Sequence, residues 1–296
     1  MARTAVHAIT SDWDYTVEKV PVFDENGKAI SGQFMNRRQD TGQVLKVGVS
    51  KDYNVVNNRD IVNPVQEVLA DLGLEPTKVS HYVMGGGARY KARFEFKDTQ
   101  IELPKVGDAM GFRLDLDNSF DLWHRIKTMG GGLRLVCTNG MTTFDKAHGI
   151  SCKHSNRFNI TNIKKAIGAA LDGFYNLAKD DNPFTVMAGR EVTQEQGINI
   201  LQNLANKGDI SEVRREAIAK VWNGPTYRED EGRNLYNLLN SVTEYTTHEV
   251  AETNFAMSEK INEKVTNRLL VAAKDESILN ALWTPAESDA VAVATA

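Results

Sequence analysis

A strict alternation of apolar and polar side chains constrains the fold of this chain more than any other feature of its sequence. Residues 88–96 read ARYKARFEF, with Tyr90, Phe94 and other apolar residues at every second position. Successive side chains of a β-strand point to opposite faces of a sheet, so this pattern predicts a half-buried strand. Its outer face would carry Arg89, Lys91 and Arg93 as a row of basic side chains.

The same alternation returns in two later runs, residues 110–117 (MGFRLDLD) and residues 133–137 (LRLVC). Together the three runs predict consecutive strands between residues 83 and 141. Arg113 and Arg134 are then expected on the outer faces of the second and third strands.

Two runs of three glycines, Gly85–Gly87 and Gly130–Gly132, precede the first and third of these strands. Neither run is followed by the Lys-Ser/Thr pair of a P-loop, and neither lies between a strand and a helix in a Rossmann arrangement. Both are predicted to be connections rather than nucleotide sites.

The N-terminal part predicts further β-structure. Residues 13–22 are strand-like, and residues 24–27 (DENG) suit a hairpin turn because glycine readily adopts a positive φ. Residues 44–50 predict another strand. A short helix is predicted over residues 63–72, with Pro64 in its first turn.

Beyond about residue 158, apolar residues recur at the spacing of amphipathic helices. Thr193 and Gln196 form a capping box at the start of one helix. Other helices are predicted for residues 162–177, 211–222, 234–250 and 257–273.

The β-rich half and the α-rich half do not alternate, which indicates the α+β class. We expect an N-terminal antiparallel, curved β-sheet with a short helix, followed by an α-helical C-terminal half. The predicted parts are a β-rich domain (1–157), an α-helical region packing on it (158–283) and a flexible tail (284–296).

Composition places the chain among globular proteins, with 41% hydrophobic and 25% charged residues. The net charge of −4 is uneven, because residues 1–165 are net basic and residues 166–296 net acidic. There is no apolar run long enough to span a bilayer and no secretory signal, and two cysteines make no disulfide framework. These features predict a cytoplasmic protein without membrane contact.

The basic row is the first candidate site. Arg89, Lys91 and Arg93 would stand about 7 Å apart along the strand, near the spacing of phosphates on an extended single strand of DNA. Aromatic side chains that could stack on bases include Phe120 and Trp123. Other basic residues could extend this patch, namely Arg37, Arg38, Arg113, Arg134, Lys153 and Arg157.

A plainer interpretation stays open, in which the row is only the solvent-exposed face of an antiparallel sheet, interrupted by acidic residues. The acids Asp115, Asp117 and Asp121 also suggest a magnesium site, because alternating carboxylates on a strand can hold Mg²⁺. A zinc set of Cys137, His148, Cys152 and His154 lacks the usual C-x2-C pair. No nucleophile motif is present, so the sequence predicts no cofactor and favours no catalytic activity.

Several motifs follow one another in a fixed order, at residues 38–42, 47–57, 118–121, 133–141 and 235–248. Together they resemble a phage- and plasmid-borne family known as domain of unknown function 932. One departure is Asp121-Leu122-Trp123, where the family usually has Asp-Gly-Ser.

The resemblance implies a phage or plasmid accessory gene. The order of a curved sheet followed by helices is also similar to Rad52-like single-strand annealing proteins, which bind single-stranded DNA along a basic groove and form rings. We therefore predict a phage-encoded protein that binds or anneals single-stranded DNA in recombination or replication, as a homo-oligomer. The alternatives are a Mg-dependent enzyme that processes nucleic acid and an accessory protein that binds a host protein.

Overall fold

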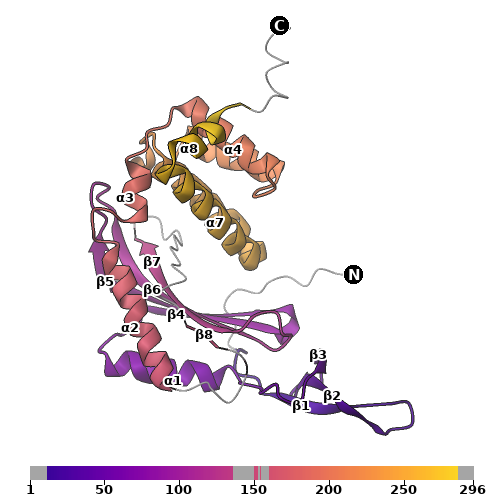
Figure 1. Cartoon of the computed structure of the whole chain (residues 1–296). Coiled ribbons are helices and arrows are strands. Elements are labelled where there is room, and N and C mark those ends of the chain that lie inside the picture. The colour runs from indigo at the N-terminus through magenta and orange to yellow at the C-terminus, as the bar shows by residue number, and fades with distance from the viewer. Residues whose placement is uncertain (1–11, 136–149, 153, 155–159, 286–296) are drawn as a thin grey trace, which may run out of the picture. The chain divides into compact units, whose positions relative to one another are not determined.

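The computed structural model describes residues 12–135, 150–152, 154 and 160–285, and it confirms the α+β class (Figure 1). The chain forms two compact units, which we call the sheet unit and the helical unit. The predicted division into domains at residue 158 stays a prediction. The sheet unit comprises Met1–Thr99, Gly111–Gly131 and Phe144–Phe174, and the helical unit comprises Gln100–Met110, Gly132–Thr143 and Tyr175–Ala296.

The N-terminal hairpin predicted from the sequence is confirmed, and it belongs to a separate antiparallel sheet of three strands. Asp24 accepts hydrogen bonds from two backbone amides of the turn, and Gly27 has a φ of 74°. Val17 packs with Tyr15 and Phe120 in a small buried cluster. The strands, in spatial order, are β1 (Val17–Phe23), β2 (Ala29–Arg38) and β3 (Val44–Val49).

The second sheet has five strands in the order β4-β5-β6-β7-β8. The predicted alternation in β5 is confirmed, because Tyr90, Phe94 and Phe96 are buried on one face. β4 pairs with β5, and β7 with β8, in antiparallel register. The bounds are β4 (Lys78–Met84), β5 (Arg89–Glu102), β6 (Ala109–Ser119), β7 (Ile126–Arg134) and β8 (Ile150–Cys152).

The two glycine runs have different structures. Gly85–Gly87 form a single 3-10 turn (η1) with positive φ at each residue, as a connection requires. The prediction for Gly130–Gly132 is wrong, because this run lies inside β7. A Cβ at Gly130 would lie 2.4 Å from the Cβ of Ala170 in α2 (Ile160–Asn176), so glycine lets the helix lie directly on the strand.

The predicted short helix is present as α1, but it begins at Arg59, which places Pro64 inside the helix rather than in its first turn. The predicted helix over residues 234–250 is divided. Its first part is the α-helix α6 (Leu235–Tyr245), and its second part is a π-helical turn, η4 (Thr246–Val250). The full bounds of α1 are Arg59–Asp71.

The helical unit contains the predicted capping box, in which the Thr193 hydroxyl accepts from the backbone of Gln196 and the Gln196 side chain accepts in return. In this unit α8 packs against both α4 and α7 (Figure 1). Within the described residues, every helix is too short or too polar to cross a membrane. The remaining helices are α3 (Pro183–Ala188), α4 (Gln194–Asn206), α5 (Glu212–Asn223), α7 (Ala251–Lys274) and α8 (Glu276–Trp283).

Candidate functional site

Three of the predicted DNA-binding cations converge on one carboxylate, Asp115. Lys91 Nζ lies 3.3 Å from Asp115 Oδ2 and 3.1 Å from Asp117 Oδ1. Arg93 Nε donates to Asp115 Oδ1 at 3.1 Å, and Arg113 Nε donates to the same oxygen at 2.9 Å. We call these five residues, Lys91, Arg93, Arg113, Asp115 and Asp117, the Asp115 cluster.

The Asp115 cluster corrects the prediction of an exposed basic row. Lys91, Arg113 and Asp115 are only 4%, 1% and 0% exposed. β5 carries Lys91 and Arg93, and the neighbouring β6 carries Arg113 and the two carboxylates, so opposite charges pair across the sheet. The cations therefore do not form a solvent-facing row.

The carboxyl group of Asp115 stays ionised because of these partners. Burial alone would raise its pKa, but the charges of Arg113, Arg93 and Lys91 outweigh burial and hold the pKa well below its usual range. The cluster thus behaves as a set of fixed, mutually dependent charges.

Arg89, the first residue of β5, belongs to a different arrangement, because its partners lie in the loop after β6. Its Nε donates to Asp121 Oδ2 at 2.8 Å, and its guanidinium carbon lies 4.0 Å from the centre of the Trp123 ring. The same Asp121 side chain accepts from the backbone N–H of Trp123 at 3.1 Å, and Leu122 has a positive φ of 65°. Asp121 thereby fixes both members of what we call the Arg89–Trp123 pair.

Arg37 and Arg38 lie in the three-stranded sheet, and each also has an acidic partner. Arg37 contacts Glu18 at 2.6 Å, and Arg38 contacts Asp40 at 2.5 Å. The Arg38 guanidinium also lies 4.0 Å from the centre of the Tyr15 ring. Two further predicted residues, Lys153 and Arg157, lie outside the described residues.

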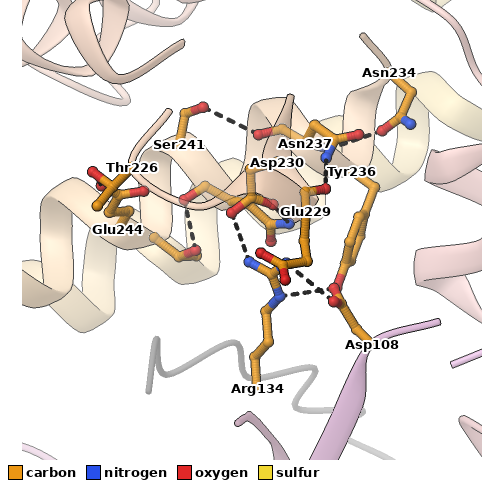
Figure 2. A network of polar contacts seen from close by, with 12 residues as sticks. Asp108, Arg134, Thr226, Glu229, Asp230, Asn234, Tyr236, Asn237, Ser241 and Glu244 are labelled. Atoms are coloured by element: carbon orange, nitrogen blue, oxygen red, sulfur yellow. Dashed lines mark hydrogen bonds and ion pairs between the residues drawn. The ribbon is translucent and has the colours of Figure 1, made fainter. Parts of the chain in front are cut away.

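Arg134 lies at the centre of a second buried network, in the helical unit (Figure 2). It donates to both carboxylate oxygens of Asp108, at 2.7 and 3.1 Å, and to Asp230 at 2.8 Å. The Tyr236 hydroxyl donates to Asp108 at 2.5 Å, and the Asn240 amide donates to Asp230 at 2.6 Å. We call these five residues the Arg134 network.

Burial alone would lower the pKa of Arg134, but its hydrogen bonds to Asp108 and Asp230 raise the pKa overall. Burial, together with the Asp108 carboxylate, raises the pKa of Tyr236 well above its ordinary value. The arginine is therefore held as a cation between two carboxylates.

The chain matches a family model over most of its length. The model described as domain of unknown function (DUF932) matches residues 45–283. The chain belongs to the DUF932 family. No match was found among curated proteins or among solved structures.

The DUF932 match includes both the Asp115 cluster and the Arg134 network, whereas β1 and β2 precede it.

The sequence prediction missed the acidic partners of Arg134 and the role of Tyr236. Tyr236 lies in one of the family-like runs, residues 235–248, which was the only signal for it. Asp108 and Asp230 stand outside any regular pattern of the sequence.

The three carboxylates proposed for magnesium do not converge on a vacant position. Asp115 and Asp117 face the cations of the Asp115 cluster, and Asp121 faces Arg89. The part of the chain that the structure describes contains no group of three or more His, Cys, Asp or Glu side chains arranged to hold a metal ion. In the zinc set, Cys137 and His148 fall outside the described residues.

Proposed function

We propose that this DUF932 protein is phage-encoded and binds single-stranded DNA during recombination or replication, in the host cytoplasm. The observation that carries the proposal is the exposure of Trp123, which is 70%. An exposed indole offers a flat apolar surface on which an unpaired base can stack. The Arg89 guanidinium, which lies over the ring, supplies the positive charge that attracts the adjacent phosphate.

The Asp115 cluster is not part of this proposed contact. Counterion release by DNA requires cations that phosphates can reach. Lys91 and Arg113 are buried, the Arg93 side chain is only 11% exposed, and all three are paired with carboxylates. Arg89 is partly exposed, and Arg125 is exposed two residues after Trp123. These two cations and the indole therefore replace the basic row as the proposed contact.

Assembly of several copies along one strand is part of the proposal. Stacking of a base on an aromatic side chain contributes roughly 1–3 kcal/mol, which gives only weak binding for one platform. Repetition of the platform in a homo-oligomer would raise the overall affinity without a new kind of contact.

Replacing Trp123 by alanine is expected to weaken binding of a single-stranded oligonucleotide about tenfold or more, because the stacking surface is removed. Fluorescence anisotropy of a labelled oligothymidine, at a fixed salt concentration, measures this change. The matched control is Phe23→Ala, another exposed aromatic residue of the sheet unit.

The control variant should bind like the unchanged protein. Equal weakening by both substitutions, or no binding by the unchanged protein at low salt, would contradict the proposal. The enzymatic alternative is tested by incubating the protein and the same oligonucleotide with Mg²⁺ or with EDTA. A metal-dependent product would favour the enzyme.

A second candidate function, binding of a host protein, is supported by the three-stranded sheet. Val20, Met35 and Val47 are cross-strand partners in one row, and Val47 is 57% exposed. Val44 on the same strand is also exposed. Apolar groups that gather on a surface commonly mark a protein contact.

Val47→Lys is expected to reduce recovery of such a partner about tenfold, because a charge would be buried in the contact. The measurement is affinity capture from nuclease-treated host lysate with the full chain as bait. Val271→Lys, a substitution at an exposed valine of α7, is the control. Identical recovery with the two variants would exclude this row as the contact.

A further inference from the structure

We propose that the helical unit contains a binding site for a small alkylammonium ligand, such as a diamine. The site is a pocket of about 550 Å³ formed by α5, the segment after it, the end of α6 and the π-helical turn η4. Pockets of roughly 300–1,000 Å³ are typical of small-molecule sites. The proposal concerns a different surface from the Arg89–Trp123 pair and does not depend on DNA binding.

The carboxylate of Glu244 is the main reason to expect a ligand. Glu244 lines the pocket and is only 8% exposed. The Thr226 hydroxyl donates to its Oε1 at 2.5 Å, and Figure 2 shows these two side chains together. Its buried Oε2 accepts no hydrogen bond from any residue that the structure describes. A buried carboxylate oxygen without a donor is destabilising, so an N–H group from a ligand would satisfy it.

The charges around the pocket favour a cation over an anion. Glu249 contributes a second carboxylate, while Lys220 contributes one ammonium group. The lining thus holds two carboxylates against one ammonium group. Two carboxylates also match a ligand that carries two ammonium groups.

The remaining lining suits the methylene chain of such a ligand. Ala217 and Val221 contribute aliphatic surface from α5, and Tyr245 contributes a half-buried ring. Aromatic rings attract alkylammonium groups through the negative face of the π-system. Apolar walls with a few polar groups that fix orientation are the usual composition of a ligand site.

The backbone next to Glu244 is also unusual. The helix changes from α to π immediately after Tyr245, over Thr246–Val250. This turn carries His248 and Glu249, which both line the pocket. Single π-helical turns occur frequently at functional sites, where they redirect side chains that a regular helix would present elsewhere.

Isothermal titration of the full chain with putrescine tests the proposal. Putrescine should bind, whereas 1,4-butanediol, its uncharged analogue of similar shape, should not. Glu244→Gln should weaken putrescine binding at least about tenfold, because it removes the buried charge. Glu263→Gln, a substitution at an exposed glutamate of α7, should leave the affinity unchanged.

A second variant keeps the test decisive if Glu244→Gln does not fold. Ala217→Phe fills the pocket from α5 and leaves the carboxylate in place, so it should also abolish binding while a circular dichroism melt stays unchanged. Three results would overturn the proposal. These are no heat of binding at millimolar putrescine, equal binding of butanediol, or equal weakening by Glu244→Gln and Glu263→Gln, which would indicate general attraction to an acidic protein.

Discussion

Replacing Asp115 by asparagine is expected to lower the free energy of unfolding by about 3–5 kcal/mol. Asparagine keeps the shape of the side chain but removes the charge that faces Lys91, Arg93 and Arg113. A complete buried ion cluster adds little net stability, but removal of one partner leaves buried charges uncompensated. Urea denaturation of the full chain measures the loss, and hydrogen exchange of the amides in β5 and β6 locates it.

Asp98→Asn is the matched control, because Asp98 is an exposed residue of the same sheet unit. It should change the free energy of unfolding by no more than about 0.5 kcal/mol. Adding Lys91→Met to Asp115→Asn should recover part of the stability, because it removes one of the uncompensated cations. The same urea midpoint for Asp115→Asn and Asp98→Asn would contradict this account of the cluster.

The contribution of Asp115 should also depend on pH in a defined direction. Its pKa in the folded chain lies below its ordinary value, so its stabilising effect is present above the unfolded pKa of about 3.9. The effect is lost as the pH falls through the lower, folded pKa. The difference between the unchanged protein and Asp115→Asn should therefore be constant near neutral pH and shrink under acid conditions.

Much of the fold follows from local patterns that a sequence displays directly. The alternation in residues 88–96 predicts β5 because a two-residue period suits only a strand with one buried face. The capping box at Thr193 predicts the start of α4 for a similarly local reason. Gly130 of β7 is different, because glycine is needed there for the close approach of Ala170, a residue distant in the chain. Sequence alone gives no access to such a contact.

In the candidate site, too, contacts between residues distant in the chain could not be predicted from local sequence patterns. The cations of β5 and the carboxylates of β6 are both visible in the sequence as alternating residues, and their ion pairs follow once β5 and β6 lie side by side. The exposure of the Trp123 side chain could be anticipated only from the position of this residue in a loop after a strand. Arg134 donates a hydrogen bond to Asp230, which is 96 residues further along the chain. A local sequence pattern carries no information about that contact.

The second large effect is expected for Arg134→Met, which should also lower the free energy of unfolding by about 3–5 kcal/mol. Methionine has a similar length but no charge, so Asp108 and Asp230 would remain buried without their cation. Hydrogen bonds from Tyr236 and Asn240 would persist but cannot replace a full positive charge. Urea denaturation, with hydrogen exchange in α6 as the local measure, tests this expectation.

Graded variants separate charge from geometry in the Arg134 network. Arg134→Lys retains the cation but loses the planar fork that contacts both oxygens of Asp108, so its stability should be intermediate. The triple change Arg134→Met, Asp108→Asn and Asp230→Asn removes all three charges together and should recover most of the loss. Arg228→Met, at an exposed arginine of the same unit, serves as the control. If the triple variant were less stable than Arg134→Met alone, uncompensated carboxylates could not be the cause of the destabilisation.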